Sequence, residues 1–275
     1  MSELTLEEKL QCLGTGNPAI ERLGIDVMWH GGEGAHGLQA RRDQSFDQGM
    51  PQPTTTFPNP NGMSATWDRE LVRQAGVALG NEARALRQKS GRGSLCLWAP
   101  TVDMERDPRW GRTEEAYGED PYLTSRLGVA FVEGLQGDGE TLKAAACAKH
   151  FAVHSGPEAV RHEFDAEATP KDMEETYLPA FQALVQEAGV EAVMGAYNRT
   201  NGEPCCGSPK LQKILREDWG FEGHFVSDCW AIRDFHEHHM VTKNARESAA
   251  LAINNGCDLN CGNTYLHILG AVQDG

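Results

Sequence analysis

The chain has 275 residues, 40% of them hydrophobic, which is enough for one large core, so we expect a single domain over residues 1–275. Forty acidic residues against 25 lysines and arginines give a formal net charge of -15. That charge repels phosphate backbones and anionic lipid headgroups, which argues against nucleic acid and membrane partners and is compatible with a neutral substrate such as a sugar.

The first ten residues are polar and helix-forming, and they contain no basic stretch followed by an apolar one. No run in the chain reaches the roughly 18 apolar residues that a membrane span needs. We therefore expect no signal peptide and, by default, a cytoplasmic or periplasmic location. The eight cysteines form no repeated C-x-x-C pair, so zinc binding is not expected and buried free thiols are favoured.

Segments with helical spacing alternate along the chain with short apolar runs that are typical of buried strands. Proline follows Thr169 and Ser208, which predicts a helix that starts with an N-cap residue and proline at each place. In chain order we expect a helix at 67–86, a strand at 95–99, a helix at 122–135, a strand at 145–148, a helix at 170–187, a strand at 190–194, a helix at 208–219, a strand at 223–226, a helix at 243–254 and a strand at 256–259.

This alternation predicts a parallel sheet covered by helices, which both an open doubly wound sheet and a closed barrel would satisfy. Polar residues follow at least five of the expected strands, and a site gathered from so many strand ends favours a TIM-barrel-like (β/α)8 fold. The sequence has no G-x-G-x-x-G or G-x-x-x-x-G-K-[ST] motif, so no nucleotide cofactor is expected.

The expected strand at 223–226 leads to Asp228 at the point where a loop begins. A carboxylate at the carboxyl end of a barrel strand indicates chemistry, and the alternative is a helix N-cap or a loop salt bridge. Lys149 and His150 follow another strand and can donate hydrogen bonds to hydroxyls, although each could also be held by a carboxylate or by the backbone. Glu33 and Tyr197 are weaker candidates.

The charge-rich segment 107–121 predicts a rigid loop with ion pairs, in which an arginine with spare donors could hold a sugar oxygen. With these residues in view, the chain resembles the amino-terminal catalytic barrel of glycoside hydrolase family 3, the β-glucosidases and β-xylosidases, over almost its full length. The matching stretches are FPNP at 57–60, APTVD at 99–103, DPRWGRTEEAYGEDP at 107–121, GLQG at 134–137, KHF at 149–151, MGAYN at 194–198 and VSD at 226–228.

The resemblance implies a retaining exo-acting β-glycosidase, in which Asp228 attacks the anomeric carbon to form a covalent glycosyl-enzyme. It implies that Arg112, Lys149 and His150 hold the hydroxyls of the terminal sugar and that Tyr197 lies beside the nucleophile. The substrate would be a small oligosaccharide or an aryl or alkyl β-glycoside, with no cofactor.

Arg161 resembles a basic residue that would keep Asp228 or its neighbours ionised by charge proximity. Two departures from the family pattern affect sugar choice. The segment EGAHGLQ at 33–39 is closer to the xylosidase-like branch, where the longer Glu33 carboxylate would intrude on the C6 hydroxymethyl group of glucose. Cys229 also stands where many relatives have a tryptophan that stacks on the sugar. Both glucosyl and xylosyl residues stay open as substrates.

A retaining mechanism also needs a general acid, which in two-domain relatives is a glutamate of the domain that follows the barrel. We expect that domain to be missing from this chain. A truncated or inactive sugar-binding barrel is therefore one alternative. A single-domain β-N-acetylhexosaminidase is another, because His162 falls at the spacing of its catalytic histidine, but Val160 stands at the aspartate position. The histidine-rich segment 235–240 is interpreted as a solvated loop, and no metal site is expected.

Overall fold

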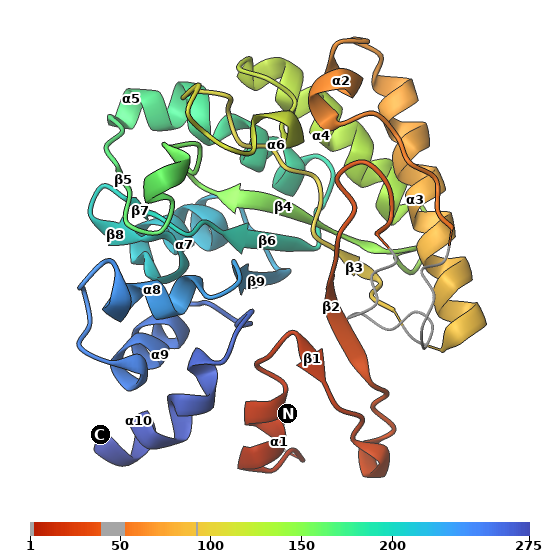
Figure 1. The fold of residues 1–275 in the computed structure, drawn as a ribbon. Coiled ribbons are helices and arrows are strands. Elements are labelled where there is room, and N and C mark those ends of the chain that lie inside the picture. The colour runs from red at the N-terminus through yellow and green to blue at the C-terminus, as the bar shows by residue number, and fades with distance from the viewer. Residues whose placement is uncertain (1–2, 40–52, 92) are drawn as a thin grey trace.

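The computed structural model describes residues 3–39, 53–91 and 93–275. Its main sheet has six strands in the order β1-β2-β3-β4-β6-β9 (Figure 1). The five strands from β2 to β9 are parallel to their neighbours, and β1 pairs with β2 in the antiparallel sense. The strand bounds are β1 Gly16–Asn17, β2 Met28–Gly32, β3 Cys96–Leu97, β4 Ala145–Phe151, β6 Ala192–Gly195 and β9 His224–Ser227.

The sheet curls, and two single bridges continue the curl beyond its outer strands. Val226 of β9 bridges Leu259, and the next residue, Asn260, bridges Gly14 just before β1. The expected strand at 256–259 is therefore reduced to one bridge. The prediction of an α/β barrel fold is confirmed, with a curled sheet of half-barrel shape in place of eight regular strands.

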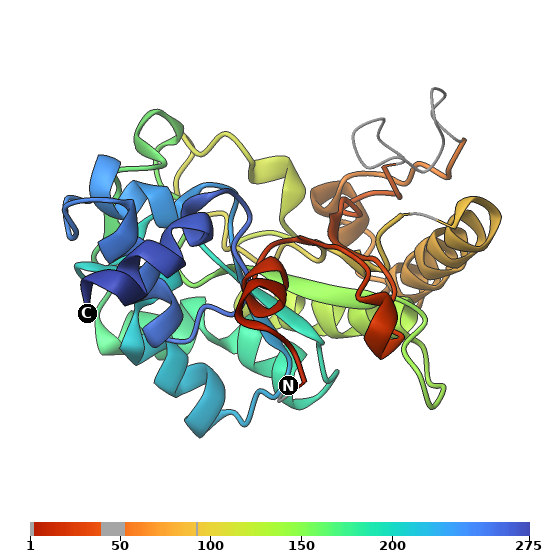
Figure 2. The same cartoon turned by 90° about the horizontal axis from the view of Figure 1, so that it is seen from below.

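Helices cover the outer face of the curled sheet, as Figures 1 and 2 show. Helices α3, α4 and α6 contact each other in turn, and α4 and α6 contact β4. The helix bounds are α1 Leu6–Gln11, α2 Pro60–Ser64, α3 Arg69–Ser90, α4 Pro121–Gln136, α5 Pro170–Asp172, α6 Pro179–Gln186, α7 Pro209–Lys213, α8 Ala231–Glu237, α9 Ala245–Asn254 and α10 Ile268–Asp274.

Both predicted helix starts are confirmed. The Thr169 side chain accepts from the backbone of Asp172, and the Ser208 side chain accepts from Leu211, each with proline at the first helical turn. Such caps satisfy backbone N–H groups that have no partner inside the helix. The expected helix at 170–187 is divided by a π-helical turn, Met173–Tyr177, and resumes as α6 at Pro179.

Successive side chains along each strand point to opposite faces of the sheet, which gives two hydrophobic layers. Ala146 and Ala148 of β4 face the helices and belong to the large core, whereas Cys147 between them faces the inside of the curl. A smaller cluster fills that interior, and its members come from one end of the strands to the other: Cys96, Trp98, Cys147, Ala192, Met194, Val226 and Leu259.

A close approach of α3 and α4 depends on Gly134. A Cβ atom at this position would lie 2.1 Å from the carbonyl oxygen of Arg73, so any side chain would push the two helices apart. The first glycine of the GLQG stretch at 134–137 is therefore required by the packing of these two helices. Because α4 rests on β4, this contact helps to fix the strand that carries Lys149 and His150.

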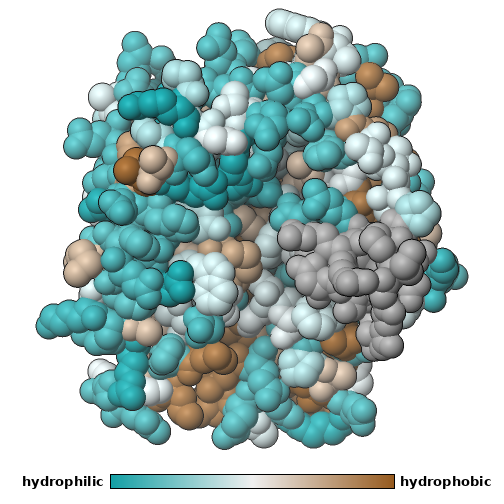
Figure 3. Space-filling view, viewed as in Figure 1, coloured by the Kyte–Doolittle hydropathy of each residue, from teal (hydrophilic) through white to brown (hydrophobic). Residues whose placement is uncertain are grey.

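A small second sheet joins β5 (Asp165–Ala166), β7 (Arg199–Thr200) and β8 (Glu203–Pro204). It ties together the loops that follow β4 and β6. The face seen in Figure 3 is mainly hydrophilic, with apolar side chains gathered near α10 and α1. Within the described ranges, the helices are all too short or too polar to cross a membrane.

Candidate active site

Asp228 follows the last residue of β9, as the sequence predicts, and its side chain is buried, with 7% of the residue exposed. Its backbone N–H donates to the carbonyl of Gly195 in β6, which holds the turn after the strand. The N–H of Cys229 donates to Asp228 Oδ1 at 2.8 Å. The N-cap of α8 is Trp230, so Asp228 does not cap that helix.

The His150 side chain, near the end of β4, contacts side chains from the loops that follow β3 and β9. Its Nε2 lies 3.5 Å from Asp228 Oδ2 and 3.2 Å from Nη1 of Arg112. Its Nδ1 lies 2.7 Å from Asp103 Oδ2, and its backbone N–H donates to Asp103 Oδ1 at 3.0 Å. Burial, followed by the charge of Arg112, lowers the pKa of His150 well below its ordinary value, so the ring is neutral at pH 7.

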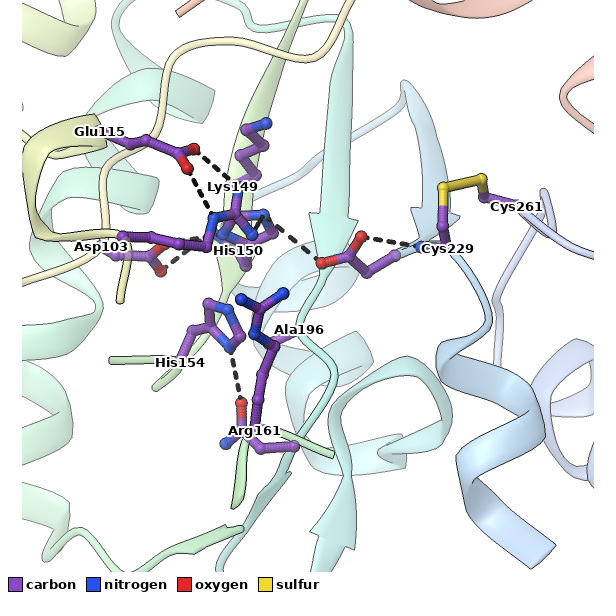
Figure 4. A network of polar contacts seen from close by, with 12 residues as sticks. Asp103, Glu115, Lys149, His150, His154, Arg161, Ala196, Cys229 and Cys261 are labelled. Atoms are coloured by element: carbon purple, nitrogen blue, oxygen red, sulfur yellow. Dashed lines mark hydrogen bonds and ion pairs between the residues drawn. A yellow bond between two sulfur atoms is a disulfide. The ribbon is translucent and has the colours of Figure 1, made fainter. Parts of the chain in front are cut away.

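Asp103 was not among the predicted site residues, although it closes the APTVD stretch. Its side chain is fully buried, and burial raises its pKa to about 7. Figure 4 shows Asp103 directed at His150 from the loop after β3. Because both carboxylate oxygens contact His150, this side chain fixes the orientation of the imidazole.

Arg112 and Lys149, two cations predicted for the site, each form an ion pair with a carboxylate. Arg112 Nε and Nη2 donate to the two oxygens of Glu115 at 2.8 and 2.7 Å, a bidentate arrangement that fixes the plane of the guanidinium. Lys149 Nζ lies 3.6 Å from Glu33 Oε2. These contacts leave Nη1 of Arg112, which meets His150, on the side of the nucleophile.

The ionisation of Asp228 is balanced between opposing effects. Burial raises its pKa, and the charges of Arg112 and Lys149, with the Cys229 N–H bond, lower it; the net shift is upward. The cations therefore offset part of the cost of a buried carboxylate. Tyr197 interacts with the same carboxylate, and burial followed by the charge of Asp228 raises the pKa of its phenol.

Arg161 lies farther along the loop after β4. It pairs with Glu158, and its guanidinium carbon lies 5.8 Å from the ring centroid of Tyr197. The cations that favour ionised Asp228 most are Arg112 and Lys149. Arg161 also lines a pocket of about 440 Å³ with Glu33 and Arg112, so all three sequence candidates face the same space.

His162 has a partner that the sequence did not reveal. Its Nδ1 lies 2.7 Å from Oδ2 of Asp234, a residue of α8 that is 1% exposed. The interpretation of 235–240 as a solvated loop is wrong, because α8 extends to Glu237 and both Phe235 and His239 are buried. Tyr197 packs edge-on against His162 at 4.6 Å between ring centroids.

A disulfide joins Cys229, next to the nucleophile, to Cys261 in the segment after α9 (Figure 4). The expectation of free thiols is wrong for these two residues. It is confirmed for the other six cysteines, of which five are buried. The bridge ties the loop that carries Asp228 to a segment 32 residues later.

A family model described as the glycosyl hydrolase family 3 N terminal domain matches residues 22–273. The xylan 1,4-beta-xylosidase of Xylanibacter ruminicola is 43% identical over 97% of this chain, which spans 31% of that protein. A solved family 3 exo-beta-xylosidase, XlnD, in complex with a xylobiose aziridine activity-based probe, has a TM-score of 0.92 at 31% identity over 100% of this chain and 36% of its own. The beta-glucosidase of Bifidobacterium adolescentis gives a TM-score of 0.79 at 30% identity over 100% and 36%. The chain thus spans about a third of the length of these relatives.

Proposed function

This chain belongs to the glycosyl hydrolase family 3 N-terminal domain family, and we propose that it carries the nucleophile and the sugar-binding half of a retaining exo-β-glycosidase. The enzyme would remove terminal β-D-xylosyl or β-D-glucosyl residues from the non-reducing end of small oligosaccharides. The main support is the buried Asp228 carboxylate, which lies 3.5 Å from His150 and within the influence of two cations.

In the first step, an Asp228 oxygen bonds to C1 of the sugar as the bond from C1 to the leaving oxygen breaks. The leaving oxygen takes a proton from a general acid, and water later releases the sugar from the glycosyl ester. Asp228 must be ionised to attack, and Arg112 and Lys149 favour that state. Its Oδ1 accepts from the Cys229 N–H, whereas its Oδ2 faces His150 at 3.5 Å, on the side where the sugar would be held, and is the oxygen that would form the bond.

The same side chains would orient the sugar. Neutral His150 can exchange hydrogen bonds with a hydroxyl on its Nε2 side, and the Nη1 of Arg112 supplies N–H donors beside it. Lys149 has three donors, and its one carboxylate contact among the described residues is with Glu33 at 3.6 Å. Sugar hydroxyls held in this way place C1 against the carboxylate, which supplies the positional part of catalysis.

We favour xylosyl over glucosyl residues. Lys149 holds Glu33 at the edge of the 440 Å³ pocket, where its longer carboxylate would occupy the space of a C6 hydroxymethyl group. A pentose lacks that group. The 43% identity to a xylan 1,4-beta-xylosidase and the likeness to the probe-bound exo-beta-xylosidase support the same preference.

Trapping the covalent intermediate tests the proposal. A 2-deoxy-2-fluoro-β-xyloside with a dinitrophenolate leaving group departs with little acid assistance, so it reports the nucleophile alone. Mass spectrometry should find one fluoroxylosyl adduct on the peptide that contains Asp228, formed faster than with the matching glucoside. Asp228→Asn should give no adduct, while Asp138→Asn, at an exposed site in the loop after α4, should label normally. A folded wild-type protein without an adduct would contradict the proposal, and sugar binding without an adduct would indicate a binding module.

The His162–Asp234 hydrogen bond supports a second candidate, a β-N-acetylhexosaminidase that uses His162 as acid and base. The buried carboxylate would hold the imidazole in position, as such a role requires. This candidate predicts that aryl N-acetylglucosaminides are hydrolysed faster than xylosides and that His162→Ala abolishes this turnover. Comparing initial rates on the two substrates separates the candidates.

A further inference from the structure

A second cluster of polar side chains lies at the opposite end of the strands from Asp228. His30 lies within β2, Cys96 is the first residue of β3, and His224 is the first residue of β9. His224 precedes Asp228 by four residues in an extended strand, which corresponds to about 13 Å. The cluster is therefore separate from the sugar site.

The three side chains converge on a common point. One ligand atom from each lies within 4.8 Å of the others, and no other group of this kind occurs among the residues that the structure describes. Cys96 Sγ lies 3.8 Å from His224 Nε2. The rings of His30 and His224 are 5.0 Å apart between centroids, with an interplanar angle of 73°.

These separations are close to those of a metal centre. Zinc–sulfur bonds of about 2.3 Å and zinc–nitrogen bonds of about 2.0 Å, arranged as a tetrahedron, put neighbouring ligand atoms roughly 3.3–3.6 Å apart. Small side-chain rotations would bring the three atoms from their present separations to that range. Two imidazoles and one thiolate form a ligand set that suits Zn²⁺.

The state of His30 supports an ion at this position. Its Nδ1 is buried and has no hydrogen-bond partner in the described part of the chain, which is unusual for a histidine in a protein interior. An imidazole nitrogen in this state has a lone pair available for a cation. A coordinated cation would interact with this lone pair.

The surroundings provide both a supporting carboxylate and a route of entry. Glu191 Oε1 lies 4.0 Å from Nδ1 of His224, the ring nitrogen that does not face Cys96. Carboxylates commonly orient metal-binding histidines through that second nitrogen. A surface pocket of about 700 Å³, lined by Glu191, Gly223 and His224, opens beside the cluster and reaches His224.

We propose that His30, Cys96 and His224 bind one Zn²⁺ ion at the amino-terminal end of the barrel strands, with water as the fourth ligand. The Cys96 thiol releases its proton to solvent as the sulfur–zinc bond forms. The ion would connect β2, β3 and β9, which come from sequence positions as far apart as 30 and 224 and are otherwise held across the interior by apolar contacts. Its role is structural, and the proposal does not depend on the glycosidase activity.

The test uses the whole chain, purified without a polyhistidine tag and treated with a chelator. Zn²⁺ titration by calorimetry should give one equivalent per chain. Co²⁺ should give a thiolate-to-cobalt charge-transfer band and the visible bands of a tetrahedral centre. Cys96→Ala should lose the charge-transfer band and at least 100-fold in affinity, and His224→Gln should weaken binding by 10- to 100-fold.

Cys205→Ala is the matched control, since it also removes a fully buried thiol but lies outside the cluster. It should bind both ions as the wild type does. Zn²⁺ should raise the melting temperature of the wild type and of Cys205→Ala but leave that of Cys96→Ala unchanged. Because each protein is compared with and without Zn²⁺, a variant that is less stable can still be tested for binding. Wild-type protein that binds no equivalent of Zn²⁺, or Cys96→Ala that binds as tightly as wild type, would overturn the proposal.

Discussion

The substitution Asp103→Asn tests whether the orientation of His150 controls reaction at Asp228. Asparagine keeps the volume of the side chain and its oxygen can still accept from the His150 backbone, now 3.0 Å from Asp103 Oδ1. The amide NH₂ would then face Nδ1, which lies 2.7 Å from Oδ2. The ring would have to carry its proton on Nε2, opposite an N–H donor of Arg112 at 3.2 Å.

The expected loss follows from the single interaction that changes. A hydrogen bond between an imidazole N–H and a buried carboxylate contributes about 1.5–3 kcal/mol. With tenfold in rate for each 1.36 kcal/mol, Asp103→Asn should label about 10- to 150-fold more slowly than the wild type. The fold should persist, because neither size nor apolar packing changes.

The measurement is the second-order rate of adduct formation with the activated fluoroxyloside, read by mass spectrometry at about pH 8, where Asp103, with a pKa of about 7, is mostly ionised. Asp234→Asn is the matched control, because Asp234 is also buried and bound to a histidine but contacts His162 rather than His150. It should label within threefold of the wild type. Equal rates for Asp103→Asn and wild type, with unchanged circular dichroism, would refute the reasoning.

Three further outcomes are expected. The folded-state pKa of Asp103, about 7, lies above the ordinary value of about 3.9, so its contribution to stability is complete below pH 4 and is lost as pH rises through 7. The free energy of urea unfolding should therefore fall more steeply over this range in the wild type than in Asp103→Asn, where the raised pKa values of Asp228 and Asp234 still act; equal slopes would contradict this. His162→Ala should label within threefold of the wild type, whereas a loss above tenfold would favour the hexosaminidase candidate. Cys261→Ser should unfold with about 3–4 kcal/mol less free energy than the oxidised wild type, since the bridge to Cys229 closes 32 residues; equal urea midpoints would exclude this contribution.

The sequence was most informative where local signals were enough. The small apolar runs predicted β4, β6 and β9, and the Thr–Pro and Ser–Pro pairs predicted two helix starts. Strand β2 was missed because its segment, Met28–Gly32, contains a histidine and two glycines, which weaken a strand pattern. Helix α8 was missed because its polar histidine-rich end is typical of a loop.

Contacts between residues far apart in the sequence could not be predicted from such local signals. The contacts of His150 with Asp103 and of His162 with Asp234 join residues 47 and 72 positions apart, and no local pattern records such a pairing. The Cys229–Cys261 disulfide also joins distant residues and could not be predicted from a local pattern. The curled sheet brings these residues together, so they emerge only from the fold.

Three cations of the candidate active site already have anionic partners: Arg112 has Glu115, Lys149 has Glu33, and Arg161 has Glu158. A uronic acid would bring a further carboxylate into this set and would have to compete with an existing ion pair for each cation. A hydroxyl needs only a spare N–H and displaces nothing. Under the proposed function, a glucuronic acid should therefore bind this site more weakly than a neutral sugar of the same size.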